Sequence, residues 1–288
     1  MHKSFFVDYN VTNNREERAE EAAVALNYFE NHDMENGPIL DIGCGNGSTT
    51  QWFSKNLNTD VVGIEVGRTL PLSSNTHNPR INLLFASGLK LPFLDKSFHT
   101  VILNDVLEHV SYEEAAELFA EINRIIDETG QLYVSVANKY EIREPHSNLP
   151  FISWLPRWIY KPVVRKIFHD DVYPYTAKRF NELAERAEFS TKNFTWMYVS
   201  KKIGKINYIG NTIVRPLVRI LNKLEFTKNL GFKRFLELFA VLIFTCKKNP
   251  IIEGKVAPYH FVMPTANFQE EAELSFNPEM LPPLEIPA

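Results

Sequence analysis

A glycine-rich segment with an acidic residue on each side is the part of this sequence best suited to chemistry. It reads Asp41-Ile42-Gly43-Cys44-Gly45-Asn46-Gly47, and Glu65 follows 18 residues after Gly47. Glycines let the backbone turn tightly and approach a ligand, and the start of a following helix offers free N–H groups. A carboxylate at the end of the next strand can accept two hydrogen bonds from a ribose diol. The pattern predicts a binding site for a cofactor that contains a nucleoside.

Two histidines are candidates for proton transfer. His109 follows the fourth predicted strand, and His146 follows the fifth. An imidazole accepts a proton near neutral pH, so each is a candidate general base for a substrate hydroxyl. A structural hydrogen-bonding role is the alternative for both residues. The two cysteines, Cys44 and Cys246, have no metal-ligand spacing, so the sequence predicts no metal site and no disulfide.

Short apolar segments that alternate with helical ones must position these residues. Continuous apolar strands separated by helices are typical of a parallel sheet covered on both faces. The predicted strands are 38–42, 60–65, 81–85, 99–104, 132–136, 194–199 and 238–245. The predicted helices are 14–32, 48–57, 111–127 and 177–187. Ser111 and Glu114 form a capping box for the third helix, and Thr176 is a candidate cap for the fourth.

Five features in this order resemble the class I S-adenosylmethionine-dependent methyltransferases, in particular the small-molecule, glycan and quinone methylases. They are the loop 41–47, Glu65, the segments 91–93 and 97–98, the segment 107–110, and Gly130 before the fifth strand. The resemblance covers about residues 36–136. It implies a Rossmann-like α/β fold with a seven-stranded, mostly parallel sheet and helices on both faces. The loop reads GxGxG, which disfavours a nicotinamide oxidoreductase because the dinucleotide fingerprint is GxGxxG.

The resemblance also implies that S-adenosyl-L-methionine is the cofactor and methyl donor. Glu65 would hold the ribose, and the glycine loop would line the methionine part. Ser87 stands where the family usually has an aspartate that contacts the adenine, which weakens the expected hydrogen bond. Another departure is His99, where the family commonly has an aspartate. The residues assigned to donor binding are Asp41, Gly43, Cys44, Gly45, Gly47, Glu65, Val66, Ser87, Gly88, Leu89, Asn104 and Asp105.

The chain divides into three predicted parts. Residues 1–36 are expected to form an amino-terminal helical lid, residues 37–249 the methyltransferase domain, and residues 250–288 an extended, acidic, proline-rich tail. For Tyr9, a place in the lid over the donor and a packing role alone are the two alternatives. Insertions at about 140–175 and 200–235 each follow a strand. Because open α/β sheets bind ligands beyond the carboxyl ends of their strands, both insertions are expected over the mouth of the site.

The distribution of charge predicts an anionic partner. The net charge is −4, yet residues 200–235 carry nine basic side chains against one acidic one, and residues 151–169 carry four against none. Together with the aromatic residues of 149–160, these segments predict peripheral contact with an anionic membrane. No apolar stretch has the length of a signal peptide or a membrane span, so a cytoplasmic location is expected. Homo-oligomer formation stays open.

The predicted function is therefore methyl transfer to a hydroxyl of a glycan, lipid-linked or secondary-metabolite acceptor. C-methylation of a quinone-like ring is the nearest alternative. An RNA methyltransferase is disfavoured because the fourth strand is followed by Asn104-Asp105-Val106-Leu107 rather than Asn-Pro-Pro-Tyr, and no RNA-binding module is recognisable. A non-catalytic protein that binds S-adenosylmethionine is the remaining alternative.

Overall fold

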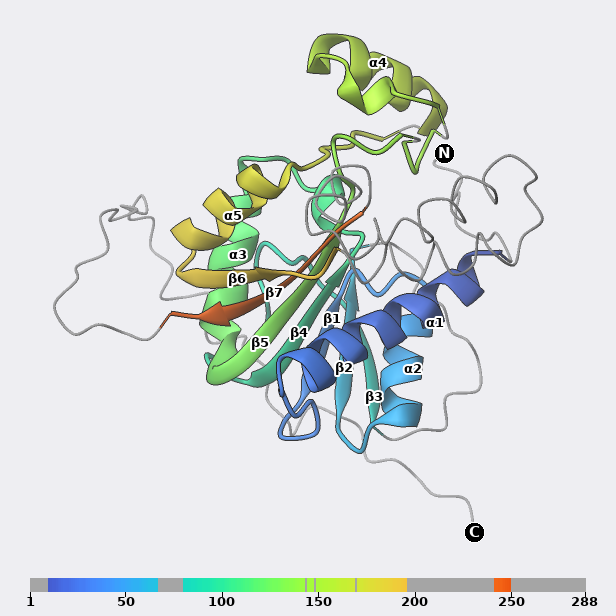
Figure 1. Ribbon diagram of the computed structural model, residues 1–288. Coiled ribbons are helices and arrows are strands. Elements are labelled where there is room, and N and C mark those ends of the chain that lie inside the picture. Colours follow the sequence, from blue (N-terminus) through green and yellow to red (C-terminus); the bar gives the residue numbers. More distant parts are fainter. Residues whose placement is uncertain are drawn as a thin grey trace, which may run out of the picture.

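Seven strands form one sheet in the order β3-β2-β1-β4-β5-β7-β6 (Figure 1). The computed structural model describes residues 10–66, 80–142, 144–147, 149–168, 170–195 and 241–249. Strand β7 pairs antiparallel with β5 and β6, and every other pairing is parallel. The strands are β1 (Ile39–Ile42), β2 (Val61–Glu65), β3 (Ile81–Phe85), β4 (Phe98–Asn104), β5 (Ile126–Val136), β6 (Phe189–Asn193) and β7 (Leu242–Lys248). The predicted fold class is confirmed.

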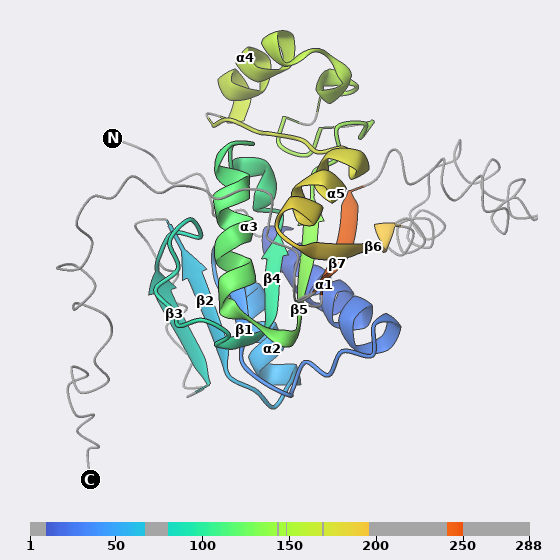
Figure 2. The same ribbon diagram turned by 90° about the vertical axis from the view of Figure 1, so that its left-hand side faces the viewer.

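Helices cover both faces of this sheet (Figure 2). Helix α1 (Asn10–Ala23), its π-helical continuation η1 (Val24–Phe29) and α2 (Ser48–Asn56) pack on one face. Helices α3 (Glu114–Ile125) and α5 (Ala177–Arg186) pack on the other. The predicted caps are present, because Ser111 Oγ accepts from the Glu114 amide at 3.2 Å and Thr176 Oγ1 accepts from the Arg179 amide at 3.2 Å.

Successive apolar side chains of the inner strands point to opposite faces of the sheet, which explains why helices must cover both faces. Ile39 and Ile102 are fully buried against α1 and α2, whereas their neighbours Leu40 and Val101 are fully buried against α3 and α5. Successive side chains of a strand point to opposite faces, so an apolar strand of this kind requires cover on each.

Two predicted strands are wrong in position. The segment 194–199 was expected to be a strand, but β6 precedes it and ends at Asn193. β6 is an edge strand with a half-exposed, polar sequence, so it lacks the apolar run that marks a buried strand. Residues 196–199 lie outside the described residues. The last strand is Leu242–Lys248, compared with the predicted 238–245, and residues 238–240 lie outside the described residues.

The departure at His99 has a structural explanation at the start of β4. His99 Nδ1 lies 2.8 Å from Asp127 Oδ2, and its ring stacks on the ring of His32 with centroids 4.4 Å apart. His32 Nε2 lies within hydrogen-bonding distance of Thr100 Oγ1, at 2.8 Å. Burial, followed by the His99 ring, lowers the pKa of His32 to about 4. His99 therefore joins the end of the first helix to the sheet, far from the donor loop.

The first insertion lies beyond the carboxyl ends of the parallel strands (Figures 1 and 2). It contains the short helix η3 (Ile152–Trp154) and α4 (Arg157–Phe168). The Tyr173 amide donates to the Glu108 carbonyl at 2.7 Å, which ties the base of the insertion to the helical turn η2 (Leu107–His109). The second insertion, the tail 250–288 and Tyr9 lie outside the described residues. In the part of the chain that is described, no helix is both long and apolar enough to cross a membrane.

Candidate active site

The glycine loop makes a tight turn at the carboxyl end of β1. Gly43, Gly45 and Gly47 have φ values of +70°, +54° and +73°. A Cβ on Gly43 would lie 2.4 Å from Val106 Cγ2, so a larger residue fits neither the backbone conformation nor the space. The turn leads directly into α2, whose first residue is Ser48. The loop therefore brings bare backbone to the edge of the sheet, as predicted.

Glu65 is the carboxylate that faces this loop. Its Oε2 accepts from the Gly45 amide at 2.8 Å, and its Oε1 accepts from the Val66 amide at 2.9 Å. Both contacts hold the carboxylate at the end of β2, beside the loop that follows β1. Val66 is 73% exposed, so the surface next to this carboxylate is apolar and accessible.

Asp41 and Cys44 support the loop from within. Asp41 is buried and accepts a hydrogen bond from Thr50 Oγ1 at 2.7 Å, and burial raises its pKa to about 6. Burial, together with the carboxylates of Asp41 and Glu65, raises the pKa of the Cys44 thiol to about 12. The thiol stays protonated at neutral pH, so Cys44 serves the loop through its backbone and not as a nucleophile.

The turn at residues 87–89 approaches the same edge of the sheet after β3. The Leu89 amide donates to Ser87 Oγ at 3.2 Å, and Ser87 forms an isolated bridge with Lys90. A Cβ on Gly88 would lie 2.8 Å from Leu118 Cδ1, so the turn packs closely on α3. The serine hydroxyl is thus engaged with the turn itself.

Asn104 ends β4 and Asp105 follows it next to the loop, because Leu103 pairs with Ile42 at the ends of β4 and β1. The Ser135 hydroxyl lies 2.8 Å from Asp105 Oδ1 and 3.1 Å from Asn104 Oδ1. Asp105 has a φ of +52°, which turns the chain sharply at this point. Among the described residues, the buried Asn104 Nδ2 has no hydrogen-bond partner.

Helix α1 contributes two arginines that sequence reasoning missed. Arg15 Nη1 donates to the Cys44 carbonyl at 3.3 Å, and Arg18 Nε lies 3.4 Å from Asp105 Oδ2. The two residues are three positions apart and therefore share one face of α1. In the sequence, this spacing shows that the two arginines share a helix face. It does not predict that this face contacts the glycine loop.

These residues fit the donor that the resemblance implies. The methionine part of S-adenosylmethionine has one carboxylate and one ammonium group, and Arg15 and Asp105 place opposite charges beside the loop. The unpartnered Asn104 amide adds a hydrogen-bond donor, and Glu65 is an acceptor for a diol. Bare backbone at Gly43 leaves room that a Cβ would fill.

A second cluster joins the two predicted histidines. The rings of His109 and His146 meet edge to face with centroids 4.9 Å apart, and both contact the ring of Phe168 at the end of α4. His146 Nδ1 lies 2.8 Å from Oε1 of the buried Glu144. Desolvation of the ring and the neighbouring His146 lower the pKa of His109, although its outer side is exposed. The structure thus brings together the two histidines that the sequence offers as separate candidates.

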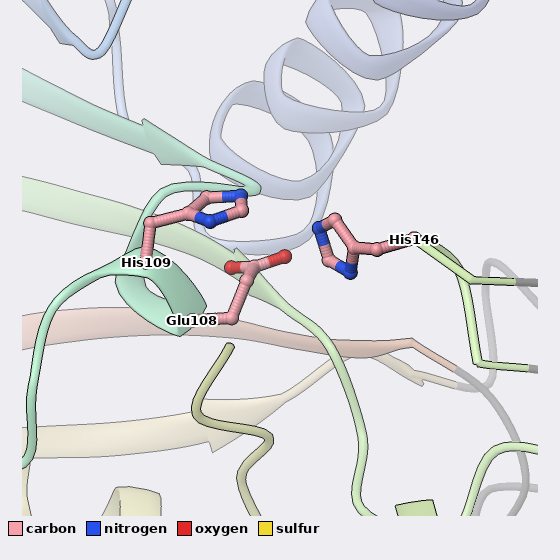
Figure 3. Close-up of side chains that lie close together, drawn as sticks. All are labelled: Glu108, His109 and His146. Carbon is pink, nitrogen blue, oxygen red and sulfur yellow. The ribbon is translucent and has the colours of Figure 1, made fainter. Parts of the chain in front are cut away.

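Glu108 completes this cluster and was not predicted. Figure 3 shows its carboxylate between the two imidazoles. The side chain is buried, and burial followed by the charge of Asp105 raises its pKa well above the usual range. Its position beside His109 in the segment 107–110 is the signal for it in the sequence.

Comparisons with known proteins agree with this geometry. Residues 40–134 match the family model of a methyltransferase domain. An uncharacterized protein of Methanocaldococcus jannaschii is 34% identical over 120 residues, which are 42% of this chain and 48% of that protein. The 24-methylenesterol C-methyltransferase 2 of Arabidopsis thaliana is 25% identical over 185 residues, 61% of this chain and 50% of the relative. The chain spans about half the length of these curated relatives.

The solved structures agree on the fold. An S-adenosylmethionine-dependent methyltransferase from Mesorhizobium loti superposes with a TM-score of 0.53 at 13% identity, covering 80% of this chain and 100% of that one. At this identity the likeness concerns the fold, while the matched domain model covers the strands that carry the loop and Glu65. Residues 40–134 therefore match a methyltransferase domain, and the chain shares the fold of an S-adenosylmethionine-dependent methyltransferase.

Proposed function

We propose that this protein transfers a methyl group from S-adenosylmethionine to a hydroxyl oxygen of a glycan, lipid-linked or secondary-metabolite acceptor. The observation that carries the proposal is the pairing of Glu65 with the glycine loop, in which the Gly45 amide donates to Glu65 Oε2 at 2.8 Å. This contact puts a diol-binding carboxylate beside bare backbone at the carboxyl edge of the sheet, where α/β proteins bind ligands.

The residues around the loop have separate tasks in this proposal. Glu65 binds the ribose, while Arg15 and Asp105 bind the two charged groups of the methionine part. The bound donor supplies an electrophilic methyl group on a sulfonium sulfur. The protein then has to align the acceptor oxygen with that methyl group, and alignment of two reactants supplies about 7 to 11 kcal/mol of a barrier.

In this proposal the methyl acceptor binds at the edge of the sheet where β4 and β5 end. His109 follows β4, and His146 comes from the insertion after β5, so both lie beyond the residues that border the loop. A hydroxyl acceptor has to lose its proton, which polar groups of this kind assist. This chemistry favours O-methylation over C-methylation of a ring. The relative named as a C-methyltransferase keeps the second reaction as the alternative to test.

We propose further that the acceptor is presented at an anionic membrane surface. Trp158 is 76% exposed on α4, and Trp154, Leu155 and Ile167 are exposed nearby. Aromatic and aliphatic side chains of this kind enter the boundary between water and lipid. The basic side chains contribute less than their number implies, since Lys161 Nζ lies 2.8 Å from Asp171 Oδ2 and Arg157 stacks over the ring of Tyr173.

The donor is tested by calorimetric titration of the purified protein with S-adenosylmethionine, with NADH as the comparison ligand. We expect Glu65→Ala to weaken donor binding by about tenfold or more, because a hydrogen bond to a charged group contributes about 1.5 to 3 kcal/mol. Asp60→Ala is the matched control, since Asp60 is an exposed acid immediately before the same strand. The proposal is wrong if the unaltered protein binds no donor or prefers NADH.

The acceptor is tested with isotope-labelled methyl donor and extracts of lipids, glycans, small metabolites and RNA. We expect label in the lipid or glycan fraction, and nuclear magnetic resonance of the product to show an O-methyl group. A C-methyl product would overturn the choice of a hydroxyl while leaving the donor assignment intact. Label in RNA would overturn the class of acceptor.

A further inference from the structure

Glu108, His109 and His146 bring three ligand-type side chains together outside the donor loop. We propose that these three residues bind a divalent transition-metal ion, of the class that includes zinc, cobalt, manganese and ferrous iron. One ligand atom from each residue lies within 4.8 Å of the other two (Figure 3). Ligand atoms around such an ion are about 3 to 3.5 Å apart, given bonds of about 2.0 to 2.2 Å. Small side-chain rotations therefore bring them into bonding positions.

The buried carboxylate of Glu108 is the second observation that points to a cation. Glu108 is 2% exposed, and within the described part of the chain its Oε2 has no hydrogen-bond partner. The backbone of Glu108 and of Ala137 donates to this carboxyl group, so Oε2 is the oxygen left without a partner. A buried polar atom without a partner costs free energy, and a bound cation would offset that cost. The neighbouring Asp105 is also an acid, so it supplies no opposite charge to this carboxyl group.

The environment of His146 resembles that of a histidine held for metal binding. Its Nδ1 lies 2.8 Å from Oε1 of Glu144, whose side chain is 1% exposed. The other carboxylate oxygen of Glu144 accepts from the Ser147 amide. Metal-binding histidines usually donate their second ring N–H to a carboxylate, which fixes the tautomer and the ring orientation. The contact with Glu144 thus leaves Nε2 of His146 as the ligand atom.

The composition of the cluster selects the class of ion. Two imidazoles and one carboxylate suit zinc and other divalent transition metals, whereas magnesium and calcium prefer oxygen ligands throughout. Three protein ligands also leave coordination positions open for water or for an acceptor. The exposed outer side of His109 gives the ion a path from solvent.

The consequence for the reaction rests on the proposed function. An acceptor hydroxyl bound to the ion would lose its proton to water more readily, because a divalent cation stabilises the oxyanion. The O–H bond would break and the oxygen would keep the electron pair. That oxygen would then attack the methyl group, while the bond from the methyl carbon to the sulfonium sulfur breaks and S-adenosylhomocysteine leaves with that electron pair. In this arrangement His109 and His146 are ligands rather than general bases. An acceptor with two adjacent oxygens would occupy both open positions.

Binding is tested with the full chain after removal of any purification tag and dialysis against a chelator. Cobalt(II) is titrated in the absence of donor and acceptor, and the visible absorption of cobalt bound by nitrogen and oxygen ligands is recorded. We expect one equivalent to bind, and Glu108→Gln and His146→Asn to weaken binding at least about tenfold. Glu113→Gln is the matched control, since it removes an exposed acid five residues away. No binding by the unaltered chain, or equal binding by all variants, overturns the proposal.

Two further measurements separate the possible failures. Titration with S-adenosylmethionine shows whether each variant is folded and whether the proposed function holds, because the donor loop does not include the cluster. Donor binding without cobalt binding overturns the metal site alone, and cobalt binding without donor binding overturns the proposed function alone. In the unaltered chain, zinc should slow the carbethoxylation of His109 and His146 measured by mass spectrometry; unchanged rates at both residues count against the site.

Discussion

Gly43 and Gly47 have nearly the same backbone conformation, with φ values of +70° and +73°, but different surroundings. A Cβ on Gly43 would lie 2.4 Å from Val106 Cγ2, whereas a Cβ on Gly47 would lie 3.5 Å from Leu83 Cδ1. The first distance is a clash and the second is ordinary contact. The two glycines therefore separate the cost of backbone conformation from the cost of lost space within one loop.

We expect Gly47→Ala to lower the free energy of unfolding by about 1 to 2 kcal/mol, the cost of a left-handed conformation for a residue with a Cβ. Gly43→Ala should lower it by about 1 to 3 kcal/mol more, because Val106 has to move. Urea unfolding at neutral pH measures both values. If both variants lose the same free energy of unfolding, Val106 moves aside at no energetic cost, and the loop packs less tightly than its geometry indicates.

Residue by residue, the donor site was more predictable than the acceptor side. The loop 41–47 and Glu65 are close in sequence, and their chemistry depends on backbone and one carboxylate. The cluster around Glu108 joins segments 37 residues apart, and the partner that orients His146 is Glu144 in the second segment. Sequence spacing says nothing about whether two such loops meet. The contact of Arg15 with Cys44 also joins distant parts of the chain, since it spans 29 residues.

At the scale of elements, His32 joins the end of the first helix to β4. It lies between Thr100 and the ring of His99, and the charges of Asp127, Lys247 and Asp33 also act on it. Its pKa is about 4 in the folded protein, compared with an ordinary value of 6.5. As the pH falls below 6.5, the unfolded chain takes up a proton that the folded protein does not. This residue therefore stabilises the fold above pH 6.5 and loses its contribution as the pH falls towards 4.

We expect the contribution of His32 to the free energy of unfolding to fall by about 2 kcal/mol as the pH is lowered from 7 to 5. Each unit of difference between the pKa values of the folded and unfolded states corresponds to about 1.4 kcal/mol. Asp41 acts in the opposite direction, because its raised pKa of about 6 favours the folded state as the pH falls. The comparison is therefore between the unaltered protein and His32→Gln, measured by urea unfolding at both pH values. An identical pH dependence in the two proteins would contradict the assignment.

Burial explains which elements could be predicted. Strands β1, β2 and β4 were predicted within one residue because they are short apolar segments inside the sheet. β3 is a half-exposed edge strand, but it was predicted because its sequence Ile81-Asn82-Leu83-Leu84-Phe85 is mostly apolar. β6 has a single neighbour and the polar sequence Phe189-Ser190-Thr191-Lys192-Asn193, so its position depends on pairing with β7 rather than on its own composition. An apolar segment next to it was mistaken for the strand.

At the scale of the whole molecule, α4 lies beyond the end of the sheet (Figure 1), and its exposed side chains carry the proposed membrane contact. Trp158, at 76% exposure, is the residue on which this contact should depend most. Leu94 is 83% exposed but lies in the loop before β4, so it serves as a control with a similarly accessible apolar side chain.

We expect Trp158→Ala to weaken binding to anionic vesicles at low salt by about tenfold, since burial of a large apolar side chain contributes about 1.5 to 3 kcal/mol. Leu94→Ala should leave vesicle affinity unchanged. Co-sedimentation with vesicles of phosphatidylserine and phosphatidylcholine measures both. If the unaltered protein does not bind, or if both variants lose the same affinity, the acceptor is not presented at a membrane through α4.

Strand β7 has a consequence for how the protein is made. It pairs with six consecutive residues of β5, yet it is separated from β5 by more than 100 residues of chain. On the ribosome, the parallel part of the sheet is complete long before Leu242 emerges. Until then the edge of β5 has unpaired N–H and C=O groups, which is the kind of surface that associates with other chains. The interval of synthesis between β5 and β7 is therefore the period in which a nascent chain most needs a chaperone.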